Sequence, residues 1–219
     1  FLFVLFIFFF FLMIRRPPRS TLDRSSAASD VYKRQKHSRE FCLNLLMDYT
    51  KSDSLLKHAF AVETCVRSYA EKFDEDIEYW GNVALLHDFD YEKFPTAEEH
   101  PFKGAEILKD KGFDEEFIKS ILSHADYSGE PRNTLLKKVL FACDELAGFI
   151  TAVTYVRPSK SIDEVEVSSV KKKLKDKAFA KAVNREDIVN GAIELSIPLE
   201  EHIQFCIDAM KKNKTLLGL

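Results

Sequence analysis

An all-α fold is predicted for residues 36–219 by three observations. Apolar residues recur at intervals of three and four along nearly the whole stretch, as on one face of a helix. Residues that start and end helices flank these segments; Pro101 stands at a first turn, and Gly112 follows a last one. No stretch alternates polar and apolar residues between hairpin turns, and no internal repeat is present. We expect a single helical domain of about seven or eight helices.

The first half of the domain contains four expected helices. Residues 54–73 carry an apolar face with Ser54 as a candidate N-cap, formed by Leu55, Leu56, Ala59, Val62, Val66 and Tyr69. The helices at 76–89, 100–112 and 114–126 follow at short intervals. The turn-forming run YSGEPRN then separates this half from the next.

The second half begins with the most apolar expected helix, 134–156. The loop RPSKS follows it. Three further helices are expected at 169–183, 185–195 and 199–212 because apolar residues keep the helical spacing there.

The first 35 residues differ in composition from the rest. The run FLFVLFIFFFFLMI has no basic region before it and is shorter than the roughly 20 residues that span a bilayer. MIRRPPRST (13–21) and SSAASDVYKRQ (25–35) resemble translations of adapter DNA used in short-read sequencing. We therefore expect residues 1–35 to be an assembly artefact fused to a gene without its start codon, and residues 36–219 to be the folded domain.

Charge and cysteine content narrow the function classes. The chain has a net charge of −3, to which residues 1–35 contribute +4, so residues 36–219 carry −7. An acidic domain has no general attraction for nucleic acid polymers or anionic membranes. The four cysteines form no CxxC pair and stand among apolar residues, which is typical of reduced thiols in a cytoplasmic protein.

Residues with metal-binding chemistry recur at the ends or inner faces of successive helices. Asp144 stands in a strongly apolar segment, where a carboxylate is costly unless something neutralises it. Taken alone, each residue has an ordinary structural explanation, such as a partly buried histidine, a helix-end pair or an N-cap. Their joint order favours a metal site: His58, His87, Asp88, His100, His124 and Asp144. The other two histidines carry no such signal, because His202 lies beside two glutamates, which predicts a surface position, and His37 adjoins the expected artefact.

These residues resemble the HD superfamily of metal-dependent phosphohydrolases, which has an all-α fold. The likeness rests on His58, the doublet His87 and Asp88, and the distant Asp144. EEHPFKGAEIL is similar to the HPxxGA segment of members that hold two metals, and ILSHADYSG to their next histidine segment. The likeness covers essentially residues 36–200, and a small bacterial HD hydrolase is the nearest parallel.

The resemblance implies a divalent transition metal, Fe, Mn, Co, Ni or Zn, bound by imidazole and carboxylate ligands. The first ion would be held by His58, His87, Asp88 and Asp144. Asp88 would also bridge to a second ion held by His100 and His124. Neighbouring side chains on a helix point about 100° apart, so a His-Asp doublet at a helix end offers both ligands to one ion. Catalytic roles would fall to His87, Asp88 and, for proton transfer, Asp126.

Two positions depart from the family pattern. The run DFDYE replaces the glycine and lysine that often follow the doublet, which leaves the general acid open among Asp90, Glu92 and Asp126. Ala125 stands where some two-metal members have another histidine, so the second ion would be more weakly held or completed by water.

An acidic phosphohydrolase needs local positive groups for its substrate. Arg157 and Lys160 follow directly from the helix that carries Asp144, and they are the first candidates to contact phosphate. Lys103 and Arg132 are weaker candidates. The alternative is that Arg157 and Lys160 simply solvate their loop.

The expected function is hydrolysis of a phosphate ester or phosphoanhydride in a small, nucleotide-like substrate by a metal-activated water. Two other classes stay open. One is an inactive HD module that only binds a nucleotide, although the ligand set favours an enzyme. The other is a di-iron oxygenase, which in related folds uses more histidines than this chain offers.

Overall fold

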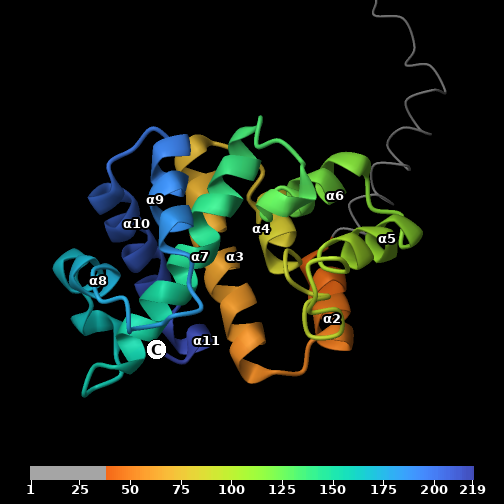
Figure 1. Ribbon diagram of the computed structural model, residues 1–219. Helices are drawn as coiled ribbons and strands as arrows, with labels where there is room; N and C mark the ends of the chain where they lie inside the picture. Colours follow the sequence, from red (N-terminus) through yellow and green to blue (C-terminus); the bar gives the residue numbers. More distant parts are fainter. Residues whose placement is uncertain (1–37) are drawn as a thin grey trace, which may run out of the picture. The chain divides into compact units, whose positions relative to one another are not determined.

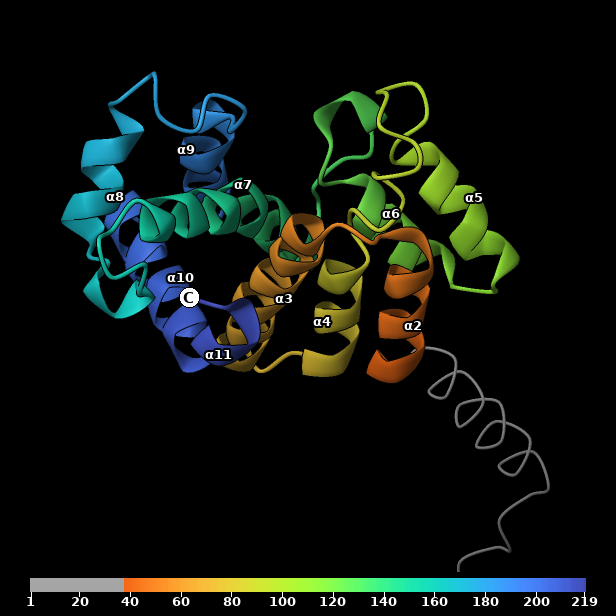
Figure 2. The same cartoon turned by 90° about the horizontal axis from the view of Figure 1, so that it is seen from below.

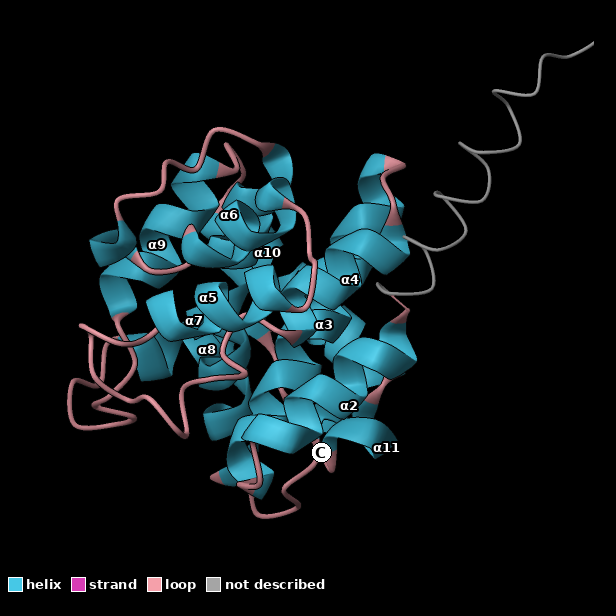
Figure 3. Cartoon of the chain, turned by 90° about the vertical axis from the view of Figure 1, so that its right-hand side faces the viewer, coloured by secondary structure: helices cyan, strands magenta, loops and turns pink. Residues whose placement is uncertain are grey.

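The computed structural model describes residues 38–219, and this part of the chain is entirely helical, without strands (Figures 1 and 3). The predicted all-α class is therefore confirmed. The ten α-helices exceed the expected seven or eight because α2 and the one-turn α11 add to the expected segments. Residues 1–35 and His37 lie outside the described residues. The α-helices are α2 (Arg39–Tyr49), α3 (Asp53–Phe73), α4 (Ile77–Leu85), α5 (Phe102–Asp110), α6 (Glu115–Leu122), α7 (Leu135–Tyr155), α8 (Val167–Leu174), α9 (Arg185–Glu194), α10 (Leu199–Lys212) and α11 (Lys214–Leu217).

The two longest helices, α3 and α7, form the centre of the domain. Figure 2 shows α3 beside α4, with α7 crossing α3. α10 packs on both α3 and α7, and α9 packs along α7. Tyr69, Leu85, Leu140 and Phe149 are fully buried between these helices. Burial of this apolar surface is the main favourable contribution to folding, at roughly 25 cal/mol per Å².

Three other helices bring their ends toward the α3 and α7 pair. α4 ends at Leu85 and α6 ends at Leu122, while α5 begins at Phe102. A helix end leaves backbone N–H or C=O groups without partners inside the helix. The convergence of three ends places many such groups around one region of the domain.

The expected helix at 169–183 ends earlier than its sequence predicts. α8 ends at Leu174, whereas the helical pattern runs on to Val183. The guanidinium of Arg185 donates to the backbone oxygens of Leu174, Asp176 and Val183 at 3.1 to 3.2 Å. Tertiary contacts of Arg185 therefore replace helical hydrogen bonds in this segment, which local propensity alone favours as helix.

His202 corrects the predicted surface position. It is fully buried, its Nδ1 lies 2.7 Å from the hydroxyl of Tyr69, and its Nε2 lies 2.8 Å from the backbone oxygen of Ala142. Burial lowers the pKa of this imidazole, so its neutral form is favoured. The neighbouring Glu200 and Glu201 face outward while His202, one position on, faces the core.

All four cysteines are buried and free of disulfides, in accord with their apolar sequence surroundings. Within residues 38–219, no helix combines the length and apolar character needed to cross a bilayer.

Candidate metal centre

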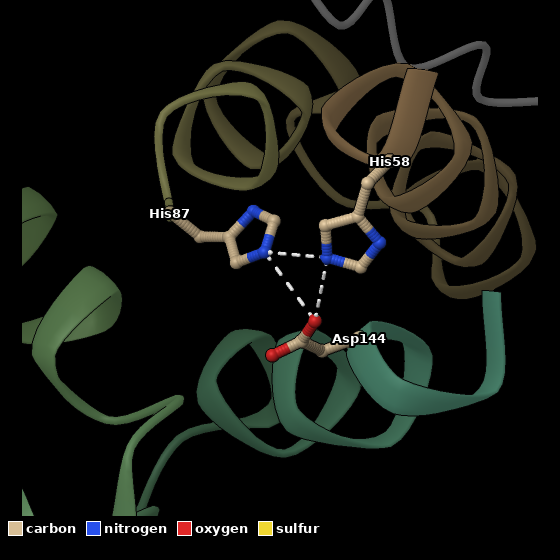
Figure 4. Close-up of side chains that lie close together, drawn as sticks. All are labelled: His58, His87 and Asp144. Carbon is tan, nitrogen blue, oxygen red and sulfur yellow. Dashed lines mark hydrogen bonds and ion pairs between the residues drawn. The ribbon is translucent and has the colours of Figure 1, made fainter. Parts of the chain in front are cut away.

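The first cluster of candidate ligands joins three different helical regions. His58 lies on α3, His87 follows the end of α4, and Asp144 lies on α7; Figure 4 shows their side chains pointing toward one another. Nε2 of His58 lies 3.0 Å from Oδ1 of Asp144 and 3.3 Å from Nε2 of His87. Nε2 of His87 lies 3.4 Å from the same Asp144 oxygen. Two imidazole nitrogens and a carboxylate oxygen thus converge on one point.

The second cluster has the same kind of donors. His100 lies two residues before the first residue of α5, and His124 lies two residues after the last residue of α6. Their Nε2 atoms lie 3.2 Å from each other. Oδ1 of Asp88 lies 3.2 Å from Nε2 of His100 and 3.3 Å from Nε2 of His124. In each cluster the donor atoms lie within 4.8 Å of one another, close enough to share an ion.

Asp88 lies between the two clusters. While Oδ1 faces His100 and His124, Oδ2 lies 3.5 Å from Nε2 of His87 and 3.8 Å from Nε2 of His58. One carboxylate therefore presents one oxygen to each cluster. This is the arrangement expected of a ligand that bridges two cations.

Helix ends fix the orientation of two imidazoles. Nδ1 of His87 lies 2.7 Å from the backbone oxygen of Ala84, and Nδ1 of His124 lies 2.6 Å from that of Ile121. Both carbonyls belong to the last turn of a helix, where they lack helical partners. Because Nδ1–H donates to each carbonyl, the lone pair of Nε2 is directed into the cluster.

Charge within the clusters shifts several pKa values. Burial opposes a charge on His87, but the carboxylates of Asp88 and Asp144 outweigh it and raise its pKa to about 10. Burial likewise opposes a charge on His100, and contacts with Asp88 and Asp90 raise its pKa to about 9. Burial alone would raise the pKa of Asp88 and Asp144, yet the imidazoles hold both below their ordinary values. These carboxylates are anionic, as cation ligands must be.

A cavity of about 450 Å³ opens onto both clusters. This volume lies in the range of roughly 300–1,000 Å³ typical of small-molecule sites. None of its lining residues is a lysine or arginine. Beyond the ligands, its wall contains three acids, one amide, an alanine and three aromatic residues: Asp126, Glu145, Asp187, Asn184, Ala125, Tyr91, Tyr127 and Phe141.

Most of this wall was absent from the sequence prediction. Glu145 adjoins Asp144, and burial followed by the charge of Asp144 raises its pKa to about 7. Asn184 and Asp187 come from the start of α9, forty residues further along the chain. An acid beside a predicted ligand is a usable signal for Glu145, but no local pattern places α9 against this cavity.

The loop with Arg157 and Lys160 does not line the cavity, which corrects the expectation that these two residues contact the phosphate of the substrate. Neither residue lines the cavity. Arg157 lies thirteen residues after Asp144, just beyond the end of α7. At about 1.5 Å per residue this places it about 20 Å away along the helix axis. Its guanidinium donates to the hydroxyl of Ser169, and Lys160 is exposed.

The two weaker basic candidates also have other partners. Lys103 is exposed and pairs with Glu106 at 2.8 Å. Arg132 pairs with Glu194 at 2.8 Å and with Asp126 at 2.5 Å, and its guanidinium lies 3.7 Å from the ring centre of Phe141. Arg132 therefore lies behind the cavity wall, whereas Asp126, the expected proton-transfer residue, is part of the wall itself.

The other two acids after the doublet have structural partners. Glu92 accepts hydrogen bonds from the backbone N–H groups of Lys51 and Ser52 at 2.7 and 2.9 Å, at the start of α3. Asp90 is buried against His100. Neither lines the cavity, so the structure does not place them for proton transfer to a substrate.

Comparison with known proteins agrees with the geometry of the centre. Residues 55–148 match the family model of the HD domain, and this range contains all six candidate ligands. The chain is also similar to the tRNA (cytidine(56)-2'-O)-methyltransferase of Thermoplasma volcanium, with 32% identity over 83 residues. That match covers 38% of this chain and 24% of the methyltransferase, so the chain spans about a quarter of that relative. No solved structure matches the chain.

Proposed function

We propose that this protein hydrolyses a phosphate ester of a small molecule at a centre of two divalent cations. The match of residues 55–148 to the HD domain, the type found in metal-dependent phosphohydrolases, supports the proposal. The observation that carries the proposal is the position of Asp88, with one carboxylate oxygen toward each cluster. The donors fit Fe, Mn, Co, Ni or Zn, since mixed imidazole and carboxylate sets suit these ions. When bound, such a pair of ions activates water near neutral pH and offsets charge on the attacking and leaving oxygens.

The side chains supply the geometry of the centre. His58, His87 and Asp144 hold one side, His100 and His124 hold the other, and Asp88 joins them. Helix-end carbonyls keep the rings of His87 and His124 from turning. A centre fixed in this way needs little reorganisation when a substrate arrives.

The aromatic wall suits the organic part of the substrate. Tyr91 and Tyr127 are partly exposed at the cavity, and Phe141 is buried beside them. Flat apolar surfaces of this kind pack against a base or another ring and exclude water from the reacting bond. This supports the expected nucleotide-like substrate.

The acidic wall limits how much negative charge that substrate carries. Asp187 and the ionised fraction of Glu145 repel phosphate groups that lie beyond the two cations, and no basic residue lines the cavity. Of the acids in this wall, Arg132 pairs only with Asp126, from behind the wall. We therefore expect a monophosphate to be preferred over a di- or triphosphate. For the same reason we do not expect a nucleic acid polymer as partner.

The test is metal analysis followed by a phosphate-release assay on the full chain. Bound metal is removed with a chelator, and the protein is reloaded with Mn, Fe, Co, Ni, Zn or Mg. Phosphate release is then measured with nucleoside mono-, di- and triphosphates and with simple phosphomonoesters as substrates. We expect metal-dependent release that is fastest with a monophosphate. A chain that holds two cations but releases no phosphate from any compound would refute the proposal. Nucleotide binding without turnover would then favour a binding module, and oxygen uptake by the iron-loaded chain would favour an oxygenase.

A further inference from the structure

The buried carboxylate of Asp90, which belongs to neither cluster, contacts His100 on the side of the ring that faces away from the second cluster. The side chain of Asp90 is 1% exposed. Its Oδ1 lies 2.9 Å from Nδ1 of His100, the ring nitrogen that faces away from the cluster. Its Oδ2 accepts a hydrogen bond of 2.7 Å from the backbone N–H of Gly104. Both carboxylate oxygens are thus used, and neither reaches the cavity.

The start of α5 holds this carboxylate in place. Pro101, at the N-cap, offers no side-chain hydrogen bond to the first turn, so the N–H of Gly104 takes Asp90 as its partner instead. The positive end of the helix dipole also favours a carboxylate there. A Cβ on Gly104 would lie 2.8 Å from Cγ of Asp90, closer than packed atoms approach, so this position must be glycine for Asp90 to fit.

The contact makes His100 unlike the other two oriented histidines. Nδ1 of His87 and of His124 donates to a neutral backbone carbonyl, whereas Nδ1 of His100 donates to a carboxylate. A carboxylate partner fixes the tautomer and also makes the opposite nitrogen a stronger ligand.

The second cluster has fewer carboxylate ligands than the first, so a carboxylate partner for His100 matters more there. The first cluster contains the carboxylate of Asp144 and also faces Oδ2 of Asp88. The only carboxylate oxygen that faces the second cluster among the candidate ligands is Oδ1 of Asp88. Asp90 supplies the second cluster with the negative charge that Asp144 supplies to the first.

We propose that Asp90 is a positioning residue for the second cation: through its hydrogen bond to His100 it sets the affinity of the His100, His124 and Asp88 site without contacting the ion or the substrate. The inference rests on the proposed two-cation centre. It predicts that the two sites respond differently to the loss of one buried carboxylate that belongs to neither ligand set.

The experiment measures stepwise cobalt binding to the metal-free full chain, by calorimetry and by the visible absorption that each equivalent adds. Asp90→Asn keeps the shape of the side chain but replaces one acceptor oxygen by an NH₂ group. The variant therefore cannot accept hydrogen bonds from both His100 and Gly104. Gly104→Ala keeps Asp90 but displaces its carboxylate. Glu92→Gln is the matched control, because it removes a negative charge from the same loop while its contacts lie with Lys51 and Ser52.

We expect Asp90→Asn and Gly104→Ala to weaken the second binding step by roughly 10–100-fold and to change the absorption of the second equivalent. The first step and the Glu92→Gln control should stay within about twofold of the unsubstituted chain. An unchanged second step in Asp90→Asn would overturn the proposal. So would equal weakening of both steps with a lowered unfolding temperature, since that result marks a purely structural role. If the unsubstituted chain binds no cobalt, both the role of Asp90 and the proposed function are refuted. If the unsubstituted chain binds two ions and releases phosphate, and Asp90→Asn binds both ions equally well, only the role of Asp90 is refuted.

Discussion

Nε2 of His58 lies 3.0 Å from Oδ1 of Asp144, although 86 residues separate the two along the chain. The pair joins α3 to α7, the two longest helices. It closes the first cluster on the side opposite His87. Each residue is partly buried, so the contact is shielded from bulk water but still borders the cavity.

Replacement of Asp144 should empty the first site and spare the second. Asp144→Asn removes the only carboxylate that belongs to the first cluster alone, while His100, His124 and Asp88 keep their mutual contacts. Metal analysis after dialysis should show about one cation per chain instead of about two. Glu186→Gln, an exposed acid on α9, is the control. Loss of both ions from Asp144→Asn alone would contradict independent sites.

Replacement of Asp88 should empty both sites. Asp88→Ala removes one carboxylate oxygen from each cluster, and the second cluster is left without any carboxylate ligand. Phosphate release should fall by at least about a thousandfold, because no cation pair remains to offset charge in the transition state. The assay compares Asp88→Ala with Asp144→Asn at equal protein and metal concentration. Retention of two cations by Asp88→Ala would show that it does not bridge them.

Metal uptake should release protons and strengthen with pH. The pKa of His87 is raised to about 10 and that of His100 to about 9, so both imidazoles are protonated near pH 7 in the metal-free chain. Each must lose a proton before Nε2 can bind an ion, so about one proton should leave for each cation bound. Calorimetry in two buffers of different ionisation enthalpy measures this number. Uptake without proton release at pH 7 would show that the rings are already neutral in the metal-free chain, against this prediction.

The same pKa values predict the pH dependence of the metal-free fold. Both folded-state values lie above the ordinary histidine value of about 6.5. The imidazolium–carboxylate contacts therefore stabilise the fold fully below about pH 6.5, and their contribution is lost as pH rises through 9 to 10. Urea unfolding of the metal-free chain at pH 6.5, 8 and 10 should show this decline. His100→Gln should show a smaller decline, and an identical one would place the titration elsewhere.

Packing between α7 and α9 should depend on one glycine. A Cβ on Gly191 would lie 2.5 Å from Cα of Ala142, a backbone atom that cannot turn aside, so Gly191→Ala should lower the free energy of unfolding by about 1–3 kcal/mol. Gly148→Ala on α7 is the matched control. Its Cβ would meet His58 at an ordinary 3.5 Å, and alanine is the better helix former by up to about 1 kcal/mol. Chemical denaturation of both variants tests the contrast, which would fail if Gly191→Ala were as stable as Gly148→Ala.

The candidate ligands could be named from the sequence because their chemistry is unusual for their positions. A carboxylate in an apolar helix, such as Asp144, is costly unless something neutralises it. Its joint order with the histidines and Asp88 on successive helices carried the signal. The helical spacing likewise gave the all-α class, because burial of one face per helix is a local property of the pattern. The structure brings all six candidate ligands together in two clusters, and their role as metal ligands stays a prediction.

The surroundings of the site were decided by tertiary contacts that no local pattern records. Proximity in sequence to Asp144 suggested that Arg157 contacts the substrate, but the rise of α7 places it about 20 Å away. Asn184 and Asp187 reach the cavity instead, because α9 packs along α7.

The sequence by itself determined the helical class and the set of candidate metal ligands, since periodicity and side-chain chemistry are properties of single segments. Only the tertiary structure decided what those residues face. In the packed structure His202 lies in the core, and α8 ends at Leu174, where Arg185 bonds the backbone. Asp90 contacts Nδ1 of His100 and is held there by the N–H of Gly104. Each of these outcomes depends on a hydrogen bond between residues that belong to different segments, at least ten positions apart in the chain. The energy of such a bond exists only once the helices have packed, so the amino-acid pattern of either segment alone cannot reveal it.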